Sequence, residues 1–312
     1  MLHVSILFLI ITLPLAAANN IRLGVIGTDT SHAVEFTHIL NDPGAPGHIS
    51  GAHVVAAWKG GSPDVKESAR NVNRYAEEMR EKWGVKIVGS ISDLCPMVDG
   101  LLLESLDGRK HLRQFRQAMA CGKPMFIDKP LSDSLSGARA IASLAQEHHI
   151  PWFSASALRF GSTARMRTSA MISAIVWAPG PTEPHQQLKL TWYGIHGLAM
   201  LYTLFGTGCV AVSEISSGDS DVITGRWKDG RLGTLHLQRP YGKWGAIVFL
   251  KNNKLRADTN ISFSYVPLVR QIVDFMSTKV PPVPNNETLE MFEFMDAAQR
   301  SVAEHGALVK LN

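Results

Sequence analysis

Polar and titratable residues directly follow several short apolar runs of this 312-residue chain. Hydroxyls, carboxylates, amines and imidazoles can bind anions or transfer protons, so these positions are candidates for a binding or catalytic site. Each apolar run has the length of one buried strand, and a helical pattern follows most of them. The candidates at the ends of these runs are Thr28, Asp29, Thr30, Ser31, His32, Lys59, Ser105, Asp128 and Lys129.

The elements around these residues alternate between short strands and helices. Such alternation predicts right-handed crossovers and a doubly wound, Rossmann-like parallel sheet over residues 19–155. Ligands of such sheets bind beyond the carboxyl ends of the strands, which is where the candidate residues stand. The expected strands are 21–26, 53–58, 86–88, 100–104, 125–128 and 151–155, and the expected helices are 34–40, 65–83, 110–121 and 136–149.

The second half, residues 156–312, has longer β-rich runs separated by turns. Alternating or β-branched segments predict strands, and three amphipathic segments predict helices. The pattern indicates an α+β domain with a large mixed or antiparallel sheet and helices on one face. The expected strands are 172–178, 210–216, 221–227, 233–239 and 246–251, and the expected helices are 195–205, 267–278 and 287–304.

The N-terminal 18 residues differ in kind from the rest. The run from Val4 to Leu15 is almost entirely apolar, and Ala16-Ala17-Ala18 has the small-x-small pattern of a signal-peptidase site. The apolar run is too short to span a bilayer as a helix. We expect an export signal cleaved after Ala18, which leaves a periplasmic or extracellular protein without a membrane span. The alternative is an uncleaved anchor or an over-extended start, with the protein cytoplasmic.

Composition excludes several classes of protein. The apolar fraction of 45% allows a packed core, and the net charge of +4 comes from scattered residues, so no nucleic-acid partner is expected. No zinc-type spacing of cysteine and histidine is found, so no metal site is expected. Cys95, Cys121 and Cys209 allow at most one internal disulfide.

Four segments, in order along the chain, resemble the Gfo/Idh/MocA oxidoreductases. Ala118–Leu131, AMACGKPMFIDKPL, is similar to their aGk-V-EKP segment, with Asp128 in place of the usual Glu. Asp99–His111 resembles their strand and TPN-x-x-H turn and retains His111. Ala157–Phe160 resembles their R-F segment. Tyr193–Gly208 resembles the helix that carries their active-site histidine, here His196.

This resemblance implies an NAD(P)-dependent oxidoreductase that acts on a secondary alcohol of a sugar or cyclitol. Lys129 would lie near the nicotinamide and the substrate hydroxyl, and His196 would accept the proton as hydride leaves the carbon. Arg159 and Tyr193 would contact substrate, and Pro130 often follows a cis bond in this family. A homo-oligomer, paired through the open sheet face, is also implied. The implied cofactor-binding residues are Gly27, Thr28, Asp29, Thr30, Ser31, His32, Lys59, Ser105, His111, Asp128 and Lys129.

The dinucleotide motif G-x-G-x-x-G corresponds to Gly27–His32, where only the first glycine is present. Asp29 stands where a glycine lets the backbone approach the pyrophosphate, and a carboxylate there should repel phosphate. The polar cluster is either a specialised ligand site or a capping turn with a solvated histidine. Lys59 and Ser62 either accept a 2′-phosphate, which favours NADP slightly over NAD, or form an ordinary basic turn.

The position four residues before His196, where the family usually has an Asp, is Trp192. Without that carboxylate, His196 lacks an orienting partner that would raise its pKa. Two functions therefore stay open. One is the oxidoreductase; the other is an exported, catalytically inactive or repurposed relative that binds a carbohydrate-derived ligand without hydride transfer.

Overall fold

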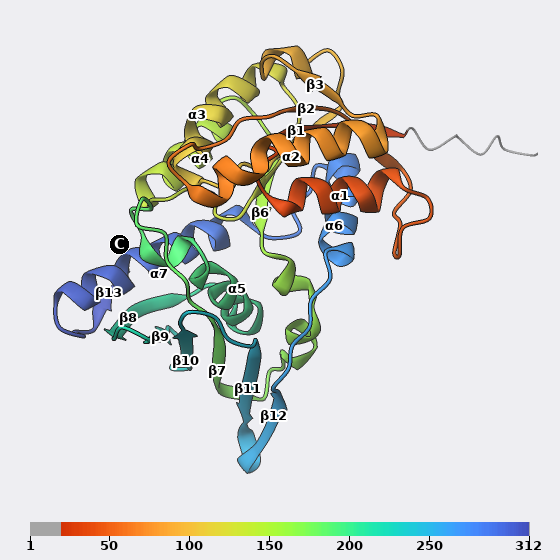
Figure 1. Ribbon diagram of the computed structural model, residues 1–312. Helices are drawn as coiled ribbons and strands as arrows, with labels where there is room; N and C mark the ends of the chain where they lie inside the picture. The colour runs from red at the N-terminus through yellow and green to blue at the C-terminus, as the bar shows by residue number, and fades with distance from the viewer. Residues whose placement is uncertain (1–19, 312) are drawn as a thin grey trace, which may run out of the picture.

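The computed structural model describes residues 20–311, which form two sheets with helices packed around them (Figure 1). The first sheet has six strands in the order β3-β2-β1-β4-β5-β6, and all of its strand pairs are parallel. The doubly wound fold is therefore confirmed. Its strands are β1 (Ile21–Ile26), β2 (Ala52–Trp58), β3 (Lys86–Val88), β4 (Gly100–Leu103), β5 (Met125–Asp128) and β6 (Trp152–Ala155).

Four helices connect these strands, and three begin at a side chain that caps them. The capping oxygens of Thr30, Asp107 and Ser134 accept hydrogen bonds from backbone N–H groups in the first turns of α1, α3 and α4. Because β1 lies between β2 and β4, the chain reverses direction across the sheet there, and a crevice is expected between the ends of β1 and β4. The helices are α1 (Ser31–Asn41), α2 (Lys66–Trp83), α3 (Gly108–Ala118) and α4 (Leu135–Glu147).

The second sheet has seven strands in the order β12-β11-β7-β10-β9-β8-β13, with one parallel pair, β10 and β7. Helices α5 (Gly194–Phe205) and α7 (Asn285–Ala303) pack on it, as the mixed-sheet prediction requires. The sequence analysis missed β12 and β13, since one is charged and exposed and the other has two residues. The strands are β7 (Met171–Pro179), β8 (Cys209–Ser216), β9 (Ser220–Trp227), β10 (Leu232–Gln238), β11 (Gly245–Leu250), β12 (Lys254–Asp258) and β13 (Val309–Lys310).

Helix α6 (Val266–Thr278) returns from the second sheet to the first and lies beside α1 (Figure 1). Leu268, Ile272 and Phe275 are buried in the same apolar cluster as the inner faces of α1 and β1. The contact is close, because a Cβ at Gly100 of β4 would lie 2.4 Å from the sulfur of Met276. The first sheet is thus completed by a helix distant in sequence.

The face of the second sheet opposite α5 exposes apolar side chains. Ile172, Ile175, Val222 and Leu232 project from neighbouring strands and are at least one-third exposed. Such a face is typical of a surface that contacts another protein. The homo-oligomer stays a prediction.

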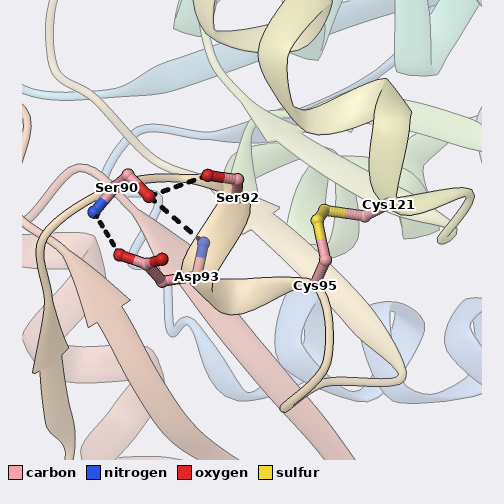
Figure 2. Close-up of a disulfide and its surroundings, with 5 residues drawn as sticks. All are labelled: Ser90, Ser92, Asp93, Cys95 and Cys121. Atoms are coloured by element: carbon pink, nitrogen blue, oxygen red, sulfur yellow. Dashed lines mark hydrogen bonds between the residues drawn. A yellow bond between two sulfur atoms is a disulfide. The ribbon is translucent and has the colours of Figure 1, made fainter.

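A disulfide joins Cys95 to Cys121, with a Cα–Cα distance of 4.8 Å (Figure 2). Cys95 follows a 3₁₀ turn in which the Asp93 carboxylate accepts from the Ser90 N–H, and the Ser90 hydroxyl accepts from the Asp93 N–H. Cys209 is free and buried. The single disulfide agrees with the limit set by three cysteines.

Within residues 20–311, no helix combines the length and the apolar character needed to cross a bilayer. The predicted export signal lies outside the described residues.

Candidate functional site

A cavity of about 120 Å³ lies between the carboxyl edge of the first sheet and the start of α5. At ~10–15 Å³ per water, it has room for roughly eight to twelve waters. The cavity can therefore hold a small ligand or one end of a larger one. The first domain and the chain just after β6 contribute Thr30, Ser31, His32, Glu67, Leu106, Lys129, Pro130, Ser156, Ala157 and Leu158.

The second domain closes the cavity with six aromatic side chains and His196. The aromatic residues come from three separate segments: the turn before α5, the β10–β11 loop, and the chain between β12 and α6. The ring of His196 meets those of Trp244 and Tyr193 edge-on. We call this set the aromatic wall: Trp192, Tyr193, Tyr241, Trp244, Phe263 and Tyr265.

Lys129 enters the cavity at the end of β5. The Lys129–Pro130 peptide bond is cis, as the resemblance implied. Among residues 20–311, no carboxylate forms an ion pair with the Lys129 ammonium, which lines the cavity. A cation is therefore available to a ligand oxygen at this point.

His196 stands in the first turn of α5, partly buried, with Nδ1 2.8 Å from the Ser156 hydroxyl oxygen. Desolvation of the ring, followed by the electrostatic effects of Lys129 and His32, holds the pKa of His196 well below its ordinary value. Trp192 lines the same cavity in place of a carboxylate. His196 is thus a neutral imidazole held by a hydroxyl.

His32 lines the cavity from the start of α1 and is paired with Asp128. Its Nδ1 lies 2.7 Å from Asp128 Oδ2, and both side chains are nearly inaccessible to solvent. Its ring stacks on Phe36 and meets Tyr265 edge-on. Burial opposes ionisation of Asp128, but its electrostatic interaction and hydrogen bond with His32 outweigh burial, so the pKa of Asp128 lies below its usual value.

Asp29 does not face solvent at the helix start; it is fully buried. Its Oδ1 accepts from the Leu106 N–H at 3.1 Å, and its Oδ2 accepts from the Ser68 hydroxyl at 2.6 Å. Burial raises the pKa of Asp29, and these hydrogen bonds offset part of the increase. The carboxylate therefore links the turn after β1 to both α2 and the chain after β4.

Further polar contacts extend this link. The Ser68 oxygen accepts from the Ser62 N–H at 2.7 Å, and the Ser62 hydroxyl donates to Asp107 at 2.7 Å. Asp107 is also bound by Arg109 and Gln186. We call Asp29, Ser62, Ser68, Leu106 and Asp107 the groove network, because together they join the chain at the ends of β1, β2 and β4.

The groove network lies at the turn that carries the dinucleotide motif. In a doubly wound fold the pyrophosphate passes the start of the first helix, at the reversal point between the two central strands. Here the turn before that helix holds the buried carboxylate of Asp29, bonded to Leu106 and Ser68. A carboxylate therefore stands where the motif has its second glycine.

The remaining nucleotide candidates lie away from the cavity. Lys59 is exposed, and its Nζ donates to Asn73 at 3.0 Å. Ser62 is buried against Asp107 and is not available to a 2′-phosphate. Thr28 is buried, and its hydroxyl donates to the Val72 carbonyl at 2.8 Å.

Ser105 and His111 form a buried support under the chain that follows β4. His111 Nε2 lies 2.7 Å from the Ser105 carbonyl oxygen, and burial lowers the pKa of His111. Arg159 forms an ion pair with Glu287 outside the main cavity. Ser105, His111 and Arg159 therefore bind neighbouring parts of the chain and do not line this cavity.

The structure brings six of the sequence candidates into one cavity: Thr30, Ser31, His32, Lys129, Tyr193 and His196. Sequence reasoning noted Trp192 only as the replacement of the family's Asp. It missed Tyr241, Trp244, Phe263 and Tyr265, together with Glu67 and Ser156. A usable signal was present, since Tyr241 and Trp244 stand in the Pro- and Gly-containing segment 238–245 between two predicted strands. Aromatic residues in loops are often ligand contacts.

No protein-family model matches the chain. An inositol 2-dehydrogenase of Cereibacter sphaeroides is 32% identical over 127 residues, which cover 39% of this chain and 31% of that protein. The match thus spans about a third of the relative. A second such protein from another strain of that species gives a similar match.

Solved structures match nearly the whole chain. Scyllo-inositol dehydrogenase of Lactobacillus casei, with bound NAD(H) and scyllo-inositol, has a TM-score of 0.74 at 12% identity and covers 94% of this chain and 99% of its own. These matches are consistent with the expected resemblance to the Gfo/Idh/MocA oxidoreductases, and the solved structures, at identities below 25%, show the shared fold. An oxidoreductase of Agrobacterium radiobacter, in complex with NAD+, L-tartaric acid and magnesium, has a TM-score of 0.70 at 14% identity, with 94% and 99% coverage.

Proposed function

We propose that this protein binds a cyclitol or a single-ring sugar in the interdomain cavity and acts on one of its secondary alcohols. The observation that carries the proposal is the composition of the cavity, in which the aromatic wall, Lys129, His32 and His196 together line a space of about 120 Å³. Aromatic faces pack on the apolar faces of a ring, while cations and imidazoles bind its hydroxyls. The inositol dehydrogenases among the similar proteins support this ligand class.

Lys129 and His196 have suitable chemistry for an alcohol. The Lys129 ammonium would stabilise negative charge that develops on the ligand oxygen. His196 is neutral because burial lowers its pKa, so its free ring nitrogen can accept a hydroxyl proton. The Ser156 hydroxyl fixes the orientation of the ring through Nδ1.

Two forms of this function differ in the cofactor. The similar proteins favour NAD(P)-dependent oxidation of the alcohol, and those with a named dinucleotide in their structures hold NAD. A nicotinamide would supply the hydride acceptor for that form. The groove network favours the second form, a relative that binds the ligand without hydride transfer, because Asp29 would have to leave its buried position before a pyrophosphate could enter.

Titrations of the purified full chain test both points. Calorimetry with myo-inositol, scyllo-inositol and glucose measures ligand binding, and nicotinamide fluorescence measures NADH and NADPH binding. Lys129→Met and Tyr241→Ala change the cavity, whereas Lys59→Met removes a matched lysine outside it. We expect polyol binding that the first two variants weaken at least tenfold and the third leaves unchanged.

Each outcome separates the hypotheses. Absence of polyol binding to folded wild-type protein would refute the proposal. Nucleotide binding in the micromolar range, with oxidation of a bound polyol, supports the oxidoreductase. Polyol binding without nucleotide binding supports the second form.

We further propose that the protein is exported. The Cys95–Cys121 disulfide supports this location, because disulfides persist in oxidising compartments and are rare in the cytosol. N-terminal sequencing of protein from fractionated cells tests it, with a new N-terminus at residue 19 expected in the exported fraction. Retention of Met1 in the cytosolic fraction would refute export.

A further inference from the structure

His32 and Asp128 form a buried histidine–carboxylate pair at the edge of the cavity. The two residues are 96 positions apart, and Asp128 Oδ2 lies 2.7 Å from His32 Nδ1. Asp128 has a lowered pKa and accepts this hydrogen bond as a carboxylate. Nδ1 of His32 therefore donates to the carboxylate, which leaves Nε2 as the ring nitrogen that can meet a ligand.

The Nε2 atom is the free end of this pair. His32 lines the cavity, and among residues 20–311 no hydrogen-bond partner reaches its Nε2. Phe36 stacks on the ring and Tyr265 meets it edge-on, so its orientation is set by packing as well as by Asp128. Nε2 is thus the ring nitrogen available to a hydroxyl of a ligand in the cavity.

His196 lacks the corresponding partner. Its Nδ1 meets the Ser156 hydroxyl, and the residue four positions upstream, before the helix begins, is Trp192. A hydroxyl cannot balance the charge of an imidazolium, whereas a carboxylate can. The cavity does contain a histidine with a carboxylate partner, but that histidine is His32, which is hydrogen-bonded to Asp128.

We propose that His32, positioned by Asp128, accepts the ligand proton in place of His196. The proposal rests on the proposed function, since it needs a ligand hydroxyl. In this step the O–H bond of the ligand breaks, its electron pair stays on oxygen, and an N–H bond forms at Nε2. The Asp128 carboxylate balances the imidazolium, and the Lys129 ammonium balances the oxygen.

The groups around this pair come from six elements. Glu35 is on α1 with His32, Glu67 projects from α2 into the cavity, and Glu104 follows β4 beside Asp128. Burial raises the pKa of Glu104 well above its ordinary value, so Glu104 is uncharged and does not compete with Asp128 for the histidine. Lys129 follows β5, His196 is on α5, and Tyr265 precedes α6.

Nitrogen-15 NMR of the full chain, labelled at histidine, reads the tautomer directly. We expect His32 in the Nδ1–H form near neutral pH, with a shift of its Nε2 resonance on addition of myo-inositol. Asp128→Asn should populate the Nε2–H form, because a carboxamide can donate to Nδ1. Glu104→Gln, on the neighbouring strand, is the matched control and should leave the tautomer unchanged.

Two substitutions of His32 separate the role of each ring nitrogen. His32→Gln places an amide near the position of Nε2, and His32→Asn places one near Nδ1. We expect His32→Asn to weaken myo-inositol binding about two- to tenfold, the effect of one lost hydrogen bond, and His32→Gln to restore part of it. A purely structural role would give equal effects for both.

The outcomes distinguish this inference from the proposed function. An Nε2–H tautomer of wild-type His32, or an inositol-induced shift at His196 but not at His32, would overturn the inference and leave the polyol site standing. Failure of inositol, scyllo-inositol and glucose to bind wild-type protein would refute the polyol site and, with it, the proton-accepting role of His32. The tautomer measurement would then still decide whether the histidine–carboxylate pair exists.

Discussion

Replacement of Asp29 by glycine should open the nucleotide path at the expense of stability. The carboxylate is fully buried and accepts from the Leu106 N–H and the Ser68 hydroxyl. Its removal restores glycine at the second position of the dinucleotide motif, where the backbone can approach a pyrophosphate. We expect NADH to bind Asp29→Gly at least tenfold more tightly than the wild type.

The cost in stability follows from the two partners left behind. A buried donor without an acceptor costs ~1–3 kcal/mol, and glycine in place of another residue costs ~0.5–1 kcal/mol through backbone entropy. The expected destabilisation of Asp29→Gly is therefore about 3–5 kcal/mol. At ~2–4 °C per kcal/mol for a chain of this size, Tm should fall by roughly 6–20 °C.

Asp29→Asn is the matched control. Its carboxamide oxygen still accepts from Leu106, and its volume still fills the passage, so the groove network stays closed. We expect a loss of about 1 kcal/mol, typical of one altered hydrogen bond, and no gain in NADH binding. Scanning calorimetry gives the stabilities, and nicotinamide fluorescence gives the affinities.

Two results would refute this reasoning. Micromolar binding of NADH to the wild type would mean that the groove network does not exclude a dinucleotide. An Asp29→Gly variant as stable as the wild type would mean that the carboxylate does not hold α2 and the chain after β4 together.

Other consequences concern stability. Burial keeps the pKa of Glu104 in the folded state above its value in the unfolded state, so wild-type stability falls as pH rises past ~4.3, by up to ~1.4 kcal/mol per pH unit. In urea unfolding, Glu104→Gln should show a shallower pH dependence and a higher stability at pH 7 than the wild type. Equal pH slopes for the two proteins would contradict the buried acid at Glu104. Reduction of the Cys95–Cys121 disulfide, which joins residues 26 positions apart, should lower the free energy of unfolding in urea by about 2–4 kcal/mol. An unchanged urea midpoint in dithiothreitol would argue against the bond. Arg159→Met leaves Glu287 buried without its partner and should lower the stability by about 3–5 kcal/mol. The double variant Arg159→Met/Glu287→Met should recover part of this loss, as measured by calorimetry.

Local patterns in the sequence were enough to predict most elements of the fold. Short apolar runs, helical periodicity and capping residues such as Thr30 act within a few residues of each other, so the strands and helices of the first domain could be placed. The missed strand β12 shows the limit of this approach. Its residues are charged and exposed, and it exists because β11 offers it an edge to pair with.

The candidate site was predicted in part. Lys129 and His196 came from motifs and lie in one cavity, as the carboxyl-edge rule and the resemblance implied. The aromatic wall could not be predicted as a unit, because Trp192, Tyr241 and Phe263 belong to three loops that meet only after the second sheet and α6 have packed.

By itself, the sequence determined the order of elements, the edge of the sheet at which a site forms, and the presence of a carboxylate where phosphate usually binds. Only the tertiary structure decided what that carboxylate does. The Asp29 carboxylate is bonded to α2 and to the chain after β4. His32, on α1, is hydrogen-bonded to Asp128 at the end of β5. Side-chain direction depends on which partners the fold brings within about 3 Å, since hydrogen bonds act only at that range. Residues far apart in sequence supply those partners, so no local pattern could reveal them.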